Sequence, residues 1–314
     1  MTHHRPYRPI RFDVISLTIK YIPVDTVRIM FADACEKMMR CTFPIMASRH
    51  FVDGRTESGI GAFVVINPEG WALSAAHVLM SVIKHKECRE KILEVERWNA
   101  AHPDQPRNPD GSWSDLHSFW FGIPGVNIEI AYINTELDLA LFKLTDFKSE
   151  YVKEYPTFKD PNKLRVGTSV CRLGFPFISA PTAFDEEKRI FFVKPGILPV
   201  PFFPNDGMYT RTISRGKTKE YGFDRLMLET TTPGLRGQSG GPIFDRSGNI
   251  VGIQSCTAHM KMGFEVNKRP GEDSPEQYLH LGLGVHVRTI IQVLEKNGVK
   301  YKSEANDDGY RIIG

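Results

Sequence analysis

Most of the chain consists of short apolar runs separated by turns that contain glycine, proline, asparagine or aspartate. Between residues 12 and 21 apolar and polar side chains alternate, which is the period-two pattern of a strand with one buried face. Other runs are almost continuously apolar, as expected of strands that are buried on both faces. Strands are predicted at residues 12–21, 42–48, 59–66, 71–74, 119–121, 128–133, 139–144, 166–176, 226–232, 243–244, 250–253 and 278–287. The pattern therefore predicts a mostly β protein.

Three segments have the composition of peripheral helices. Residues 25–40 begin at Asp25, a helix-capping residue type, and residues 84–100 are rich in Lys, Glu and Arg with few apolar positions. Residues 288–297 are amphipathic and end before Gly298, a typical helix stop. Two other parts are predicted to be irregular: residues 177–225 form extended loops or a hairpin, and the ends of the chain, before residue 12 and after Lys302, are loose.

The most informative stretch is residues 234–244, Gly-Leu-Arg-Gly-Gln-Ser-Gly-Gly-Pro-Ile-Phe. Its core, Gly-x-Ser-Gly-Gly-Pro, arises by chance in about one in several thousand chains of this length. Glycines around Ser239 allow a tight turn in which backbone N–H groups converge on one point. Such a point suits an oxyanion, and the adjacent hydroxyl suits a nucleophile.

Two classes of hydrolase share the spacing Gly-x-Ser-x-Gly. In α/β-hydrolases a helix follows the serine, and the acid and histidine come later in the chain. Here Pro242 is followed by two short apolar runs on either side of a turn at residues 245–249, which predicts a β-hairpin. The hairpin favours a trypsin-like double β-barrel, in which histidine and aspartate precede the serine.

His77 and Asp138 are the candidates for those two positions. His77 follows two alanines at the end of a predicted strand, and Asp138 begins the apolar run at 139–144, where a carboxylate needs a hydrogen-bond partner. Each has a simpler interpretation, since His77 can be a core histidine bonded to backbone and Asp138 a strand-initiating residue that faces water. The order His77, Asp138, Ser239 is that of the chymotrypsin class.

Composition excludes several other functions. The chain has 314 residues, and its 40 basic and 37 acidic residues give a net charge of +3, too balanced to indicate nucleic acid or an anionic membrane as a partner. Six histidines were compared with the spacing of metal-hydrolase motifs and do not match it: His85, His102, His117, His259, His280 and His286. We therefore expect no metal and no cofactor.

The cysteines and the N-terminal sequence indicate the cellular compartment in which the protein is expected. The five cysteines (Cys35, Cys41, Cys88, Cys171 and Cys256) are odd in number and lack paired spacing, which favours free thiols. The first twenty residues lack the apolar core of a signal peptide, and no run approaches the ~18 apolar residues of a membrane span. These features predict a cytoplasmic protein.

The motifs together resemble those of trypsin-like serine peptidases, especially the bacterial HtrA (Deg-type) branch. The similarity is carried by Gly-x-Gly-x-Phe-Val at 59–64, Ala-Ala-His-Val at 75–78, Asp-Leu-Ala-Leu at 138–141 and Gly-Gln-Ser-Gly-Gly-Pro at 237–242. It implies a double six-stranded antiparallel β-barrel of the chymotrypsin type with a few peripheral helices. The expected organisation is an N-terminal extension (1–41), a protease domain (42–298) with barrel one at about 42–150, barrel two at about 160–287 and a helix at 288–297, and a tail (299–314), with insertions at 85–125 and 177–225.

The resemblance also implies roles for individual residues. Ser239 would be the nucleophile, His77 the general base and Asp138 the residue that orients the imidazole, while the N–H groups of Gly237 and Ser239 would form the oxyanion hole. Six residues would line the pocket for the side chain before the cleaved bond: Pro233, Gln254, Ser255, Cys256, Gly282 and Gly284. Because none of them is charged and the glycines leave space, a small-to-medium apolar side chain is expected there.

The chain departs from the patterns of known trypsin-like peptidases in three respects. Arg236 stands where the HtrA branch usually has proline, and it can narrow the oxyanion loop or flip it into an inactive form. Gln238 precedes the serine, where pancreatic-type enzymes have an aspartate that pairs with a new N-terminus, so activation by trimming is not implied. No PDZ domain is expected after Asn297.

The predicted function is a serine endopeptidase acting on a protein or peptide substrate. Without a sensing domain such an enzyme needs restraint, which residues 1–41 or 177–225 can supply alone or by docking a regulatory protein partner. The alternative is a catalytically silent trypsin-fold binding or scaffold protein whose serine loop is locked in an inactive form.

Overall fold

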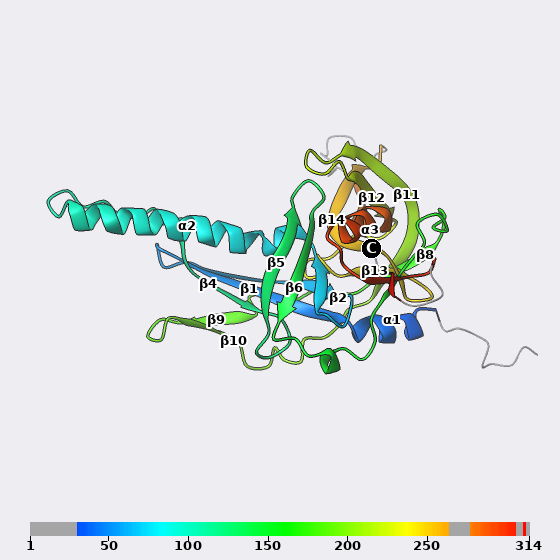
Figure 1. The fold of residues 1–314 in the computed structure, drawn as a ribbon, viewed down its shortest axis with the longest axis horizontal. Helices are drawn as coiled ribbons and strands as arrows, with labels where there is room; N and C mark the ends of the chain where they lie inside the picture. The colour runs from blue at the N-terminus through cyan, green and yellow to red at the C-terminus, as the bar shows by residue number, and fades with distance from the viewer. Residues whose placement is uncertain (1–29, 264–276, 306–309, 312–314) are drawn as a thin grey trace, which may run out of the picture.

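Two curled antiparallel sheets form the body of the protein (Figure 1). The computed structural model describes residues 30–263, 277–305 and 310–311, so the strand predicted at 12–21 lies outside the described residues. The mostly β fold with a few helices agrees with the sequence-based prediction.

The first sheet has six strands in the order β4-β1-β2-β3-β6-β5. Its strands are β1 (Thr42–Phe51), β2 (Thr56–Val65), β3 (Trp71–Ser74), β4 (Ser114–Trp120), β5 (Asn127–Asn134) and β6 (Leu139–Thr145). Phe63 lies at the centre of its core, stacked on Phe43 and in edge contact with Phe121. Each such aromatic pair contributes about 1 kcal/mol beyond the area that it buries.

The second sheet contains a closed six-stranded barrel, because the order β13-β8-β11-β12-β15-β14 is completed by pairing of β13 with β14. These strands are β8 (Ser169–Arg172), β11 (Asn205–Lys217), β12 (Asp224–Thr230), β13 (Pro242–Asp245), β14 (Asn249–Lys261) and β15 (Tyr278–His286). The hairpin predicted after Ser239 is thus present as β13 and β14. A separate two-stranded sheet joins β9 (Thr182–Asp185) and β10 (Ile190–Val193).

Two predictions about the second half of the chain are incomplete. The segment 177–225, expected to consist of loops or a hairpin, does contain the hairpin β9–β10, but it also supplies β11, a central barrel strand with 13 residues. The tail is also more ordered than expected: β16 (Tyr301–Ser303) pairs with β7 (Thr157–Phe158) and with β17 (Tyr310–Arg311). Tyr301 is fully buried, which gives this polar segment an apolar anchor that its composition hides.

In the described part of the chain, three α-helices accompany the sheets: α1 (Ala32–Met39), α2 (Ala76–Ala101) and α3 (Val287–Lys296). A short 3-10 helix spans Ser149–Tyr151. The helix α2 has 26 residues and begins eight residues earlier than predicted, with only Ala75 between it and the end of β3. Figure 1 shows its far end projecting from the body of the molecule. The helix α1 contacts β1 and β13, one strand from each sheet.

Among the described residues, no helix combines the length and the apolar character that crossing a membrane requires.

The position of α1 between the sheets predicts that its buried face stabilises the protein. Met38 is fully buried, whereas its neighbour Met39 is 41% exposed. Met38→Ala should lower the free energy of unfolding by about 2–4 kcal/mol, because it leaves a cavity in the core. The matched control Met39→Ala should change it by less than about 0.5 kcal/mol. Urea denaturation of both variants tests this, and equal effects would show that α1 is not packed as described.

Candidate active site

The histidine of the candidate site lies in the first turn of α2. β3 ends at Ser74, Ala75 has an extended backbone, and the helix begins at Ala76, so His77 is its second residue. No side chain from the start of the helix caps its free N–H groups. The first turn therefore needs an acceptor from elsewhere in the chain.

Asp138 supplies that acceptor. Its Oδ1 accepts a hydrogen bond from the His77 backbone N–H at 3.0 Å, which is the contact that an N-capping side chain makes. Asp138 has a left-handed backbone (φ 55°) in the turn before β6, and the side chain of Asn134 holds this turn by accepting a hydrogen bond from Leu137 N–H at 3.0 Å. The carboxylate is thus fixed at the positive end of the helix dipole.

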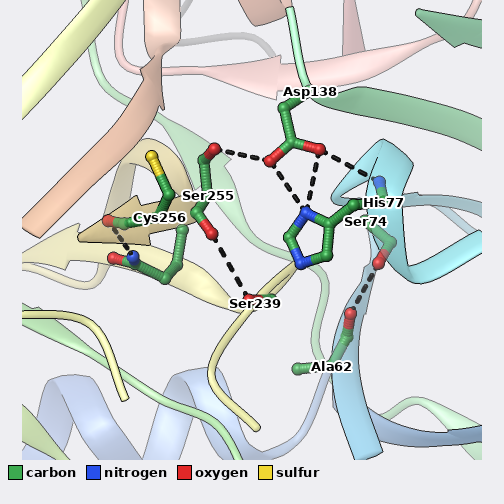
Figure 2. Close-up of polar contacts among 8 residues, drawn as sticks. Ala62, Ser74, His77, Asp138, Ser239, Ser255 and Cys256 are labelled. Carbon is green, nitrogen blue, oxygen red and sulfur yellow. Dashed lines mark hydrogen bonds and ion pairs between the residues drawn. The ribbon is translucent and has the colours of Figure 1, made fainter. Parts of the chain in front are cut away.

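The same carboxylate binds the imidazole and a hydroxyl from the other sheet (Figure 2). Nδ1 of His77 lies 2.9 Å from both carboxylate oxygens. The Ser255 hydroxyl, on β14, donates to Oδ2 at 2.5 Å. Burial would by itself raise the pKa of Asp138, but the hydrogen bonds from His77 and Ser255 outweigh it and lower that pKa below its usual value. Asp138 is therefore ionised at neutral pH.

The loop that carries Ser239 is held by backbone hydrogen bonds on two sides. The Ser239 carbonyl accepts from Ala62 N–H of β2 at 2.8 Å, and Gly240 N–H donates to the Gln254 carbonyl of β14 at 2.8 Å. The Ser239 hydroxyl donates to the Ser255 carbonyl at 3.3 Å. In Figure 2 the imidazole lies between Asp138 and Ser239, with Nδ1 turned towards Asp138.

Two backbone amides of this loop remain available. Phe175 N–H donates to the Gly237 carbonyl at 2.9 Å, and Gln238 N–H donates to the Leu235 carbonyl at 3.0 Å. Within the described part of the chain, the N–H groups of Gly237 and Ser239 donate no hydrogen bond. Gly237 has a φ of +94°, a conformation that disfavours any other residue.

A cavity of about 760 Å³ opens beside these groups, and His77, Gly237 and Ser239 are among the residues that line it. Residues of β1, β2 and the segment 176–180 also line it. Arg236, expected to narrow or flip the loop, has an exposed side chain that also faces this cavity. The size is within the range of ligand-binding clefts.

The six residues expected to line a side-chain pocket do lie near one another, but protein atoms fill the space between them. β14 and β15 pair so that Gln254 is opposite Gly284 and Thr257 is opposite Gly282. A methyl group added to Gly234 would lie 2.1 Å from the Gln254 side-chain amide. Pro233 and Cys256 each offer a backbone carbonyl that is already hydrogen-bonded, to the side chains of Asn205 and Gln254.

The space expected beside Gly282 is also taken. A methyl group there would lie 2.6 Å from the guanidinium of Arg172, a residue that was not among the sequence candidates. The only signal in the sequence is a lone arginine in the apolar strand 170–173. The second contact that sequence reasoning missed is the Ser255 hydroxyl on Asp138, since Ser255 was assigned only to the pocket wall.

The approach of the serine loop to the first sheet predicts that Gly240 cannot be replaced. It has a φ of +83°, and an added Cβ would lie 2.2 Å from both the Ala62 carbonyl and the Ser74 hydroxyl. Gly240→Ala should lower the free energy of unfolding by about 2–4 kcal/mol through backbone strain and overpacking. The control Gly54→Ala has a similar φ of +84° but open space around it, and should cost only about 1 kcal/mol. Urea denaturation separates the two, and equal losses would contradict the described contact.

The hydrogen bonds to Asp138 predict a pH-dependent contribution to stability. Because its folded pKa is depressed, this contribution is fully present above the unfolded value of about 4 and is lost as the pH falls through the folded value. Asp138→Asn should therefore cost about 1–3 kcal/mol at pH 7 and progressively less below pH 4. Asp146→Asn, at an exposed residue with a similar φ of 58°, is the control and should cost little at either pH. A loss at Asp138 that does not change with pH would contradict the prediction.

Similar solved structures include "HtrA-type protease AlgW with tripeptide", with 16% identity, a TM-score of 0.46 and coverage of 85% of this chain and 62% of that chain. Another is "HtrA-type protease AlgW with decapeptide", with 15% identity, a TM-score of 0.49 and coverage of 85% of this chain and 67% of that chain. The chain thus spans about two thirds of the length of these structures. No curated protein matches the sequence.

Residues 59–253, more than half of the chain, match the trypsin-like peptidase domain family. The matched range contains His77, Asp138 and Ser239. The chain belongs to the family of trypsin-like peptidase domains.

Proposed function

We propose that the protein is a serine endopeptidase that hydrolyses peptide bonds through His77, Asp138 and Ser239. The observation that carries the proposal is the shared Asp138 carboxylate, which binds Nδ1 of His77 at 2.9 Å while the imidazole lies towards Ser239. This is the arrangement that a general base needs, since the carboxylate fixes one tautomer and stabilises the imidazolium.

The reaction follows from the groups around the cavity. The Ser239 hydroxyl turns from the Ser255 carbonyl towards His77, gives its proton to the imidazole and attacks the peptide carbonyl carbon. The N–H groups of Gly237 and Ser239 donate to the oxyanion, for which one donor is typically worth about 3 kcal/mol of barrier. His77 then protonates the leaving amine, and water hydrolyses the acyl-enzyme by the reverse sequence.

Two observations favour an enzyme over a silent scaffold. The two amides of the oxyanion hole are not used by hydrogen bonds within the described residues, whereas a locked loop would use at least one of them. The cavity of about 760 Å³ gives a peptide access to His77 and Ser239. A protein or peptide substrate fits this cleft, and residues 1–41 and 177–225 are the proposed places for a regulatory contact.

The expected preference for a small-to-medium apolar side chain assumed open space beside Gly282 and no charge among the residues around it. The structure supports neither assumption, because the Arg172 guanidinium adjoins Gly282. The effect of this charge on substrate preference is argued below.

Ser239→Ala should abolish labelling by a fluorophosphonate probe and reduce peptide cleavage by about 10⁴-fold or more, because the nucleophile is lost. His77→Ala should have a similar effect on cleavage. The control Ser247→Ala alters an exposed serine in the turn that follows β13 and should leave both readouts unchanged. Failure of the wild-type protein to label under any condition would favour the scaffold, and cleavage by Ser239→Ala would refute the assignment.

A further inference from the structure

Arg172 is a charged residue in the interior of the second barrel. Along β8, side chains alternate between the two faces, so Arg172 shares a face with Val170. Val170 belongs to a buried cluster with Leu228 and Ile243, and Arg172 is paired with Ile243 in the register of β8 and β13. Only 1% of Arg172 is exposed. The Arg172 side chain therefore runs from the apolar interior of the barrel, where charged residues are seldom found without a partner.

The partners that Arg172 does have are neutral. Nη1 donates to the Thr232 carbonyl at 2.8 Å, and Nη2 donates to the Thr230 hydroxyl. Nε is buried and has no hydrogen-bond partner among the described residues. Glu229 of the same barrel shows the usual arrangement for a buried charge, because its carboxylate forms an ion pair with Arg211 at 2.9 Å. Among the described residues no carboxylate plays that part for Arg172.

This charge persists although burial opposes it. Desolvation lowers the pKa of Arg172 to about 10, which still leaves the guanidinium protonated at neutral pH. A buried ion without a counter-ion is unfavourable for the folded protein, and an incoming anion would relieve that cost.

The guanidinium of Arg172 lies beside two residues that were expected to contact the substrate. Gly282 and Pro233 belong to the pocket that the family resemblance assigns to the residue before the cleaved bond. Nη2 of Arg172 lies 2.6 Å from the position of a methyl group on Gly282, and Nη1 binds the carbonyl of Thr232, the residue before Pro233. The Thr257 hydroxyl of β14 donates to the Gly234 carbonyl of the serine loop at 2.8 Å and so joins the two sides of this region. Arg172 thus adjoins the residues assigned to the pocket.

We propose, on the basis of the peptidase function above, that Arg172 is a specificity-determining residue that selects substrates with Asp or Glu before the scissile bond. The substrate carboxylate enters between the walls, displaces the Gln254 side chain and the bridge from Thr257, and accepts hydrogen bonds from the guanidinium. It supplies the counter-ion that the barrel lacks. A neutral side chain of the same shape leaves the buried charge unpaired.

The first test uses the wild-type protein and a peptide series that differs only at the residue before the cleaved bond: Glu, Asp, Gln, Leu and Arg. We expect kcat/KM for the better acidic peptide to exceed that for the Gln peptide by roughly 100-fold, because Gln keeps the shape and loses the charge. A profile led by Leu, Gln or Arg overturns the proposal. This measurement does not depend on any variant being able to fold.

The second test assigns the preference to Arg172. Arg172→Met removes the charge and keeps a long side chain, and should lower kcat/KM for the acidic peptide by roughly 100-fold while leaving the Leu peptide within a few fold. The control Arg215→Met removes an exposed charge on β11 and should leave the ranking of the peptides unchanged. An unaltered acidic preference in Arg172→Met overturns the proposal.

Covalent probes separate failure of the specificity from failure of the enzyme function. A simple fluorophosphonate reports on Ser239 alone, whereas peptidyl phosphonates with a Glu or a Leu side chain also report on the pocket. Labelling by the simple probe together with faster inactivation by the Leu phosphonate contradicts only the role of Arg172. Absence of labelling by every probe contradicts the proposed function itself.

Discussion

The Asp138 carboxylate joins three parts of the molecule that are distant in sequence. It caps the first turn of α2, binds the imidazole that this turn carries, and accepts a hydrogen bond from Ser255 in the other sheet. With the backbone bond from Ala62 to Ser239, it links the two sheets beside the cavity. The position of His77 relative to Ser239 therefore depends on contacts that also hold the sheets together.

The two buried charges, Asp138 and Arg172, have opposite surroundings. Asp138 is surrounded by donors that favour its ionised form, so its burial is offset within the protein. Arg172 has only neutral partners, so its burial is not offset by any group among the described residues. A buried charge whose partners favour the ionised form is compatible with the free protein, whereas a buried charge without a counter-ion favours binding of a ligand of the opposite sign.

The sequence was most informative where the structure depends on short segments. The turn around Ser239 and the hairpin after it follow from consecutive glycines, a proline and two apolar runs, and both were predicted. The start of α2 was not predicted, because the side chain that caps it is Asp138, which lies 61 residues after His77 in the chain. No residue type near His77 in the sequence indicates a helix start. β11 was missed because its alternation is interrupted by polar and glycine residues, and its place is set by pairing with β8 and β12.

Long-range packing also explains what could not be predicted about the pocket. The neutral wall residues and the glycines lie near one another, yet the atoms that fill the space between them come from Gln254 itself and from Arg172 on a different strand. Arg172 reaches Thr230 and Gly282 only after the barrel has closed. Likewise, the polar tail gains its order from Tyr301, whose ring packs edge-on against Phe158.

The left-handed backbone at Asp138 has a consequence for how this position can vary. Among residues with a side chain, only aspartate and asparagine adopt that conformation at low cost. Glutamate, the other carboxylate, would strain the turn and also move its oxygens one methylene further from the helix. The left-handed backbone and the need for a carboxylate beside the imidazole thus restrict the residue type at position 138 independently. Aspartate is the one amino acid that satisfies both requirements.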